Sequence, residues 1–99
     1  MRLSEPILSL VIEALEASFG QTKAYLFGSR VDDTRHGGDI DIALAAEMTR
    51  EEFRRKKAAF RKHLFLKNLD LKIDLLLWNR KTDALLKREI EKNHILLNQ

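Results

Sequence analysis

The sequence predicts an α/β (α+β) domain in which helices flank a small mixed sheet of about four strands. Segments whose apolar residues recur every three or four positions alternate along the chain with short segments that are apolar throughout or strictly alternating. Glycine, asparagine and polar clusters separate these segments. Strands that alternate with helices over 99 residues indicate a single domain, residues 1–99, built around one sheet.

The first element is a helix over residues 4–19. Ser4 is a suitable N-cap, and Pro6 lies in the first turn, where its missing N–H costs no hydrogen bond. Gly20 is a natural stop for this helix. Its apolar face repeats at helical spacing and consists of Ile7, Leu8, Val11, Ile12, Leu15 and Phe19.

A short strand follows over residues 23–27, "KAYLF", and ends at Gly28 and Ser29. Residues 29–35 predict a turn followed by a short helix. The adjacent glycines at 37 and 38 predict a loop, because glycine is the residue that most readily lets a backbone bend.

The next strand, residues 39–45, reads "DIDIALA" and alternates with period two. This alternation places Asp39, Asp41 and Ala43 on one face of the strand and the aliphatic residues between and after them on the other. Two carboxylates therefore point to the same side of a strand that belongs in the core.

A long helix begins after this strand and runs to about residue 66. Thr49 and Glu52 have the spacing of a capping box, in which a threonine hydroxyl and a glutamate satisfy two backbone N–H groups of the first turn. The residues expected to face inward are Phe53, Phe60 and Leu64.

The last third of the chain predicts a strand over residues 71–78, "LKIDLLLW", and a helix over residues 82–92. Either Thr82 or Asp83 can cap this helix, since both side chains accept hydrogen bonds from backbone N–H groups. The closing "HILLN", residues 94–98, predicts a final short strand.

The composition indicates an ordinary folded protein, with 44% hydrophobic and 33% charged residues and a net charge of +3. The absence of cysteine excludes disulfides and thiolate metal sites. No basic-then-apolar leader opens the chain, and no apolar run is long enough to span a bilayer. We therefore expect a cytoplasmic protein that does not bind membranes.

Three carboxylates are the strongest functional signal. Asp74 is surrounded by apolar residues in the strand "KIDLLL", and it would join Asp39 and Asp41 if the two strands are neighbours. Buried carboxylates without partners would cost several kcal/mol, so a cation between them is expected. Oxygen ligands suit Mg²⁺, and three carboxylates can hold two metals about 3.5–4 Å apart for phosphoryl transfer.

A phosphate site is expected just before these acids. Gly28 and Ser29 lie where a strand gives way to a helix start, so backbone N–H groups there can bind an anion at close approach. Arg30 adds a forked donor suited to phosphate oxygens.

These motifs, "GSR" followed by "DID" and then an isolated acid in a later strand, resemble the polymerase-beta-type nucleotidyltransferase superfamily, and the short chain is most similar to its minimal nucleotidyltransferases. The resemblance implies that Gly28 and Ser29 hold the nucleotide triphosphate and that Asp39 and Asp41 bind Mg²⁺ (or Mn²⁺). Asp74 would be the third carboxylate, which helps to deprotonate the acceptor hydroxyl.

The resemblance also implies a partner. Such proteins are commonly paired with a helical HEPN-domain protein, where the nucleotidyltransferase is the antitoxin and transfers AMP from ATP to the partner. Two alternatives remain open: a non-catalytic partner-binding module with the same fold, and a transferase acting on RNA ends. The basic run at 54–63, "RRKKAAFRKH", could bind nucleic acid, but a solvated helix face is the favoured interpretation.

Overall fold

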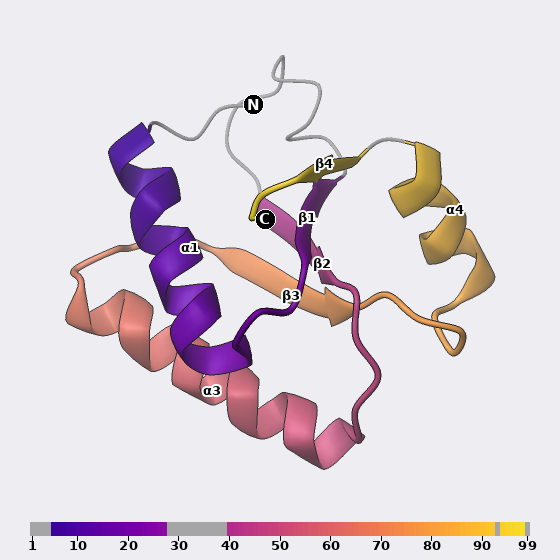
Figure 1. The fold of residues 1–99 in the computed structure, drawn as a ribbon, viewed down its shortest axis with the longest axis horizontal. Coiled ribbons are helices and arrows are strands. Elements are labelled where there is room, and N and C mark those ends of the chain that lie inside the picture. The colour runs from indigo at the N-terminus through magenta and orange to yellow at the C-terminus, as the bar shows by residue number, and fades with distance from the viewer. Residues whose placement is uncertain (1–4, 28–39, 93, 99) are drawn as a thin grey trace. The chain divides into compact units, whose positions relative to one another are not determined.

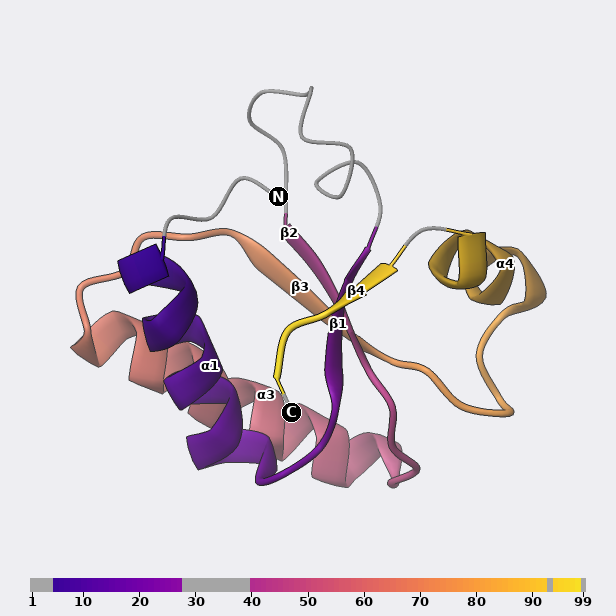
Figure 2. The same ribbon diagram turned by 45° about the horizontal axis from the view of Figure 1, so that its top comes forward.

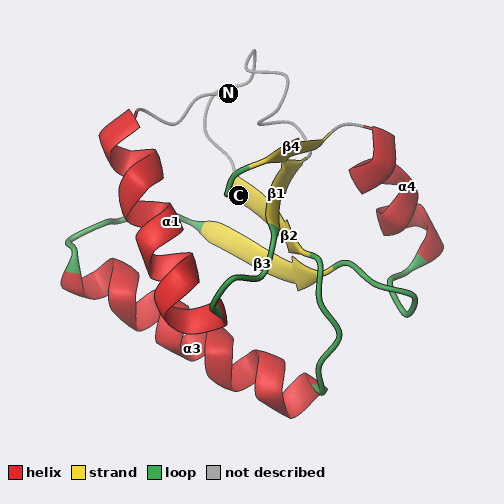
Figure 3. Ribbon diagram, viewed as in Figure 1, coloured by secondary structure: helices red, strands yellow, loops and turns green. Residues whose placement is uncertain are grey.

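The structure, a computed structural model, describes residues 5–27, 40–92 and 94–98 (Figure 1). These residues form two compact units. The helical unit combines the described chain up to Thr22 with residues 48–71, and the sheet unit combines residues 23–47 with the chain from residue 72 onward, each over its described residues. Figure 3 distinguishes the helices from the strands.

The sheet unit contains a four-stranded mixed sheet in the order β3-β2-β1-β4. Central strand β1 runs antiparallel to both of its neighbours, whereas β2 and β3 are parallel (Figure 2). The strands are β1 (Ala24–Phe27), β2 (Ile40–Leu44), β3 (Ile73–Leu77) and β4 (His94–Leu96). Each predicted strand is present, and its ends coincide with the predicted limits or lie one or two residues inside them.

Helix α4 (Ala84–Lys92) packs on one face of this sheet. Its fully buried Ile90 lies in a cluster with Phe27 of β1 and Ala43 of β2, and Trp78 packs against the same cluster. The predicted helix over residues 82–92 is confirmed. The opposite face of the sheet is apolar and buried, and it carries Leu26, Ile42, Leu44 and Leu75.

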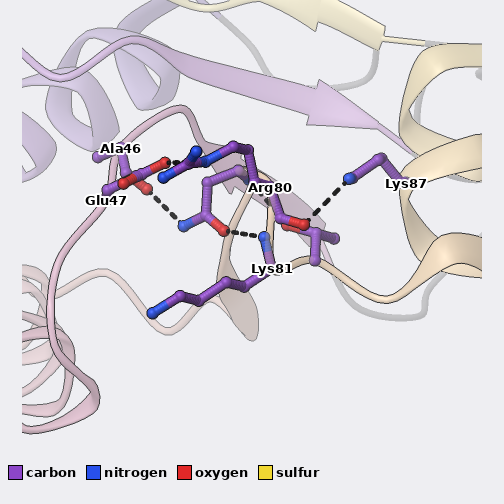
Figure 4. Close-up of polar contacts among 7 residues, drawn as sticks. Ala46, Glu47, Arg80, Lys81 and Lys87 are labelled. Carbon is purple, nitrogen blue, oxygen red and sulfur yellow. Dashed lines mark hydrogen bonds and ion pairs between the residues drawn. The ribbon is translucent and has the colours of Figure 1, made fainter.

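Hydrogen bonds and an ion pair hold the turn between β3 and α4 (Figure 4). The Asn79 amide donates to the Ala46 carbonyl at 2.8 Å, and its own carbonyl accepts from the Lys81 backbone N–H at 2.8 Å. Arg80 pairs with Glu47 at 3.3 Å. The turn therefore ties the start of α4 to the segment that follows β2.

Asp83, not Thr82, caps α4. The Asp83 carboxylate accepts from the backbone N–H groups of Leu85 and Leu86 at 3.1 and 3.4 Å. The Thr82 hydroxyl is already engaged, because it accepts from the backbone N–H of Asn79 at 2.8 Å within the turn.

In the helical unit, α1 (Glu5–Phe19) and α3 (Arg50–Leu66) lie side by side, and both predicted helices are confirmed within the described residues. The rings of Phe19 and Phe53 are 6.1 Å apart between centroids. Lys67 donates to Glu13 at 2.7 Å, and this ammonium lowers the pKa of the Glu13 carboxyl. The predicted cap Ser4 and the predicted turn and short helix at 29–35 lie outside the described residues.

Both ends of α3 are capped by recognisable motifs. The Thr49 hydroxyl accepts from the Glu52 backbone N–H at 3.0 Å, as the capping-box spacing predicts. At the other end Asn68 has a positive φ of 59°, and the N–H of Leu69 reaches back to the Leu64 carbonyl at 3.0 Å. This is a Schellman motif with asparagine in the left-handed position. Every helix within the described ranges is too short or too polar to cross a lipid bilayer.

Candidate active site

Two of the predicted carboxylates are direct neighbours in the sheet. Asp41 of β2 and Asp74 of β3 are register partners in the parallel ladder. Residues opposite one another on paired strands carry their side chains on the same face, and neighbouring strands lie about 4.8 Å apart. The two carboxylates therefore share one side of the sheet, as the sequence predicts.

The register extends this pair into a row across all four strands. Phe27 of β1 is the partner of Asp41, and His94 of β4 is the partner of Phe27. The row stands at the end of β1 and the start of the other three strands. The next row inward on this face includes the buried Ala43, which belongs to the cluster under α4. The carboxylates thus lie at the margin of the face that α4 covers.

The two acids differ in exposure: Asp41 is half-buried, whereas Asp74 is exposed. Access to water lowers the cost of keeping a carboxylate ionised, so this margin can hold two negative charges where the closed core could not. Two such carboxylates offer oxygen ligands to a hard divalent cation, and an exposed one can also accept a proton from a hydroxyl.

The remaining predicted site residues, Gly28, Ser29, Arg30 and Asp39, lie outside the described residues. Over the part of the chain that the structure describes, no group of three or more His, Asp or Glu side chains could hold a metal ion. The structure therefore brings together two of the three predicted carboxylates, and the role of the third stays a prediction.

An aromatic cluster beside the carboxylates is absent from the sequence-based site. Tyr25, Trp78 and His94 pack edge to face, with centroids 5.2 to 5.4 Å apart. His94 Nδ1 lies 2.8 Å from the carbonyl oxygen of Ile90, which fixes the ring against the end of α4. His94 joins this site because it lies opposite Phe27 in the sheet. That pairing joins strands from opposite ends of the chain, so no local sequence pattern predicts it.

Comparisons with known proteins identify the family. A family model described as polymerase beta nucleotidyltransferase matches residues 11–99. One similar solved structure is a toxin–antitoxin with AMP-PNP, with a TM-score of 0.67 and 25% identity over 91% of this chain and 71% of that one. Another is the toxin–antitoxin MntA–HpeT in a mutant with two aspartates replaced by glutamate, with a TM-score of 0.68 and 24% identity over the same shares. No curated protein matches the sequence.

The family match covers nearly the whole chain, including both described carboxylates and every strand. The fold agrees with it, since the solved structures superpose over most of this chain. The chain belongs to the polymerase beta nucleotidyltransferase family and is a nucleotidyltransferase.

Proposed function

We propose that this chain transfers AMP from ATP to a hydroxyl group of a helical HEPN-type partner and is the antitoxin of a toxin–antitoxin pair. The observation that carries the proposal is the register of Asp41 with Asp74 on one face of two parallel strands. Both similar structures are toxin–antitoxin complexes, and one was solved with AMP-PNP, an analogue of ATP. We further propose that residues 1–99 act as one domain in the cytoplasm, beside a partner encoded by the neighbouring reading frame.

Asp39 completes the carboxylate set in this proposal. It precedes Asp41 by two residues, the spacing at which the side chains of a strand point to the same face. Gly28, Ser29 and Arg30 would bind the phosphates. They follow Phe27, the partner of Asp41, directly along the chain.

The donor set suits Mg²⁺ or Mn²⁺, because neighbouring carboxylates supply the oxygen ligands that hard divalent cations prefer. Asp39, Asp41 and Asp74 would hold the ion, and when bound it neutralises charge on the triphosphate. Serine, arginine and backbone N–H groups in the phosphate site would orient the β- and γ-phosphates.

The transfer is a displacement at the α-phosphorus. The acceptor oxygen forms a bond to that phosphorus, the bond to the oxygen bridging the α- and β-phosphates breaks, and pyrophosphate leaves with the electron pair. Asp74 takes the proton of the acceptor hydroxyl. Its exposed position at the margin of the sheet face supports this role, since a protein-borne hydroxyl must reach it from outside.

The test is incubation of the chain with labelled ATP, Mg²⁺ and the product of the neighbouring reading frame, followed by mass measurement of that product. We expect a mass increase of one AMP. Asp39→Ala and Asp41→Ala should abolish the transfer, and Asp74→Ala should retain ATP binding without transfer.

A pull-down with the same variants separates chemistry from partner binding. We expect all three to retain the partner, because the carboxylates act on the nucleotide. A wild-type chain that binds the partner but never modifies it would contradict AMP transfer. If the Asp39→Ala variant protects cells from the partner as well as the wild-type chain does, binding alone is enough to neutralise the partner.

A further inference from the structure

Helix α3 presents an exposed face that the fold does not explain. Between residues 50 and 67 the chain carries eight Lys or Arg and two Glu, although the net charge of the whole chain is only +3. The rest of the chain therefore has more acidic than basic residues. The exposed residues in the middle and last turns of α3 recur at helical spacing, and we name them the α3 stripe: Arg54, Arg55, Ala58, Arg61, Lys62, Phe65 and Leu66.

The basic residues of α3 divide into two groups. Lys56 pairs with Glu52 at 3.8 Å, and Lys57 lies 5.0 Å from the centre of the Phe53 ring. The four cations of the α3 stripe have no ion pair with any other described residue. Their charges are available to a ligand along a helix face that rises about 18 Å from the first to the last residue of the stripe.

Two large apolar side chains end the stripe. Phe65 is 78% exposed and Leu66 is 65% exposed. They point outward because the helical repeat turns the preceding residue, Leu64, inward, where it is buried. A hollow of about 310 Å³ adjoins Phe65 and is also lined by Asn68, Leu69 and Asp70. Exposed apolar side chains beside a hollow are characteristic of interaction sites.

We propose that the α3 stripe is a docking surface for a protein whose contact face is acidic and carries an apolar side chain that fits against Phe65 and Leu66. Opposite charge would steer this partner to the four cations, and the apolar contact would hold it. The inference rests on the proposed function in one respect: it takes the docked protein to be the partner that accepts AMP.

Other occupants fit the stripe less well. A polyanion such as RNA would meet the four cations and could stack a base on Phe65, but it would leave the exposed Leu66 without an apolar contact. A second copy of the chain in a symmetric contact would set the same four cations against each other. An acidic protein surface that carries an apolar side chain meets the four cations and covers Phe65 and Leu66 at the same time.

The test measures the affinity of the neighbouring-frame product for two double variants. Arg61→Glu with Lys62→Glu reverses two stripe charges, and Phe65→Ser with Leu66→Ser removes the apolar contact. All four side chains are exposed, so both variants should fold, as checked by circular dichroism. We expect each to weaken partner binding about tenfold or more.

Matched controls lie on α4, in the other unit. Arg88→Glu with Lys92→Glu makes the same change of charge, and Leu85→Ser removes a leucine that is 72% exposed. Both should bind the partner like wild type. Equal weakening in the two charge-reversal variants would show a dependence on net charge and overturn the proposal, as would wild-type affinity in both stripe variants.

Single-stranded RNA and the chain alone are assayed beside the partner. RNA binding that the stripe variants abolish, with partner binding unchanged, would assign the stripe to nucleic acid and overturn the proposal. Self-association of the wild-type chain that the stripe variants lose would assign the stripe to a second copy and overturn the proposal. A wild-type chain that does not bind the partner at all would overturn this inference and the partner of the proposed function together.

Failure of the inference and failure of the proposed enzyme chemistry remain distinguishable. Asp41→Asn should bind the partner normally and transfer no AMP. The stripe variants should transfer AMP with a raised KM for the partner and an unchanged kcat, because the stripe acts on docking and not on the reacting atoms.

Discussion

We expect the stabilisation of the fold by Mg²⁺ to depend on the carboxylate of Asp41. The perturbation is Asp41→Asn, which replaces a charged oxygen ligand by a neutral amide of nearly the same shape at a half-buried position beside Asp74. A cation that binds only the folded chain stabilises it by mass action. We expect Mg²⁺ to raise the melting temperature of the wild-type chain and to have much less effect on the variant.

The size of the effect follows from mass action once the dissociation constant is set. For a dissociation constant of about 1 mM, about 10 mM Mg²⁺ adds roughly 1.4 kcal/mol to the free energy of unfolding. In a domain of this length that corresponds to a rise in Tm of about 5–10 °C. If loss of one carboxylate weakens binding about tenfold, roughly 0.4 kcal/mol of stabilisation remains, and the rise falls to about 2–3 °C.

The assay is thermal unfolding at matched ionic strength with Mg²⁺, with Mn²⁺ and after chelation. Asp70→Asn is the control, because it removes an exposed aspartate that belongs to the helical unit and not to the predicted carboxylate set. It should keep the full response to the metal. Equal responses in wild type and Asp41→Asn would refute metal binding by this carboxylate.

Three further predictions concern stability. Asn68 has a φ of 59°, so Asn68→Gly should keep or raise the Tm, whereas Asn68→Val should cost about 1–2 kcal/mol in thermal unfolding; equal stability of the two would contradict the left-handed cap. Asn98 accepts from the buried Ala24 N–H at 2.8 Å, so Asn98→Ala should cost about 1–3 kcal/mol in urea unfolding, and no loss would mean that this bond adds nothing. Lys67 lowers the pKa of Glu13, so their pairing stabilises the fold above the unfolded-state pKa near 4.5, and this contribution disappears as the pH falls through the lower folded-state pKa. Glu13→Gln should therefore weaken the loss of stability between neutral and acidic pH, measured as urea midpoints; an unchanged profile would show that solvent screens the pair completely.

Local signals predicted α3 well because both of its ends depend on residues close in sequence. Thr49 and Glu52 define its start through one hydrogen bond that spans three residues. The cap of α4 was harder. Thr82 and Asp83 are both good caps, and the choice depends on Asn79, whose contact with Ala46 lies 33 residues away in the chain. A sequence pattern does not contain that contact.

The candidate site was predictable to a similar limit. Asp74 is an acid inside an apolar segment, which indicates that this part of a buried strand is exposed. The family resemblance links Asp74 to Asp41. The register that makes them partners could not be read from the sequence, because parallel strands are aligned by packing of the intervening crossover and not by a turn. The roles of Gly28, Ser29, Arg30 and Asp39 stay predictions.

The crossover also bears on the α3 stripe. Parallel β2 and β3 must be joined by a long connection, and α3 is the helix in it, so the fold itself requires a helix at this point of the chain. Folding constrains the inward residues of that helix, such as Phe60 and Leu64, which are buried. It places no demand on the outward residues beyond solubility, and solubility disfavours an exposed phenylalanine beside an exposed leucine. Since neither the fold nor the carboxylate pair needs Phe65 and Leu66, a docking role is the physical reason that accounts for them.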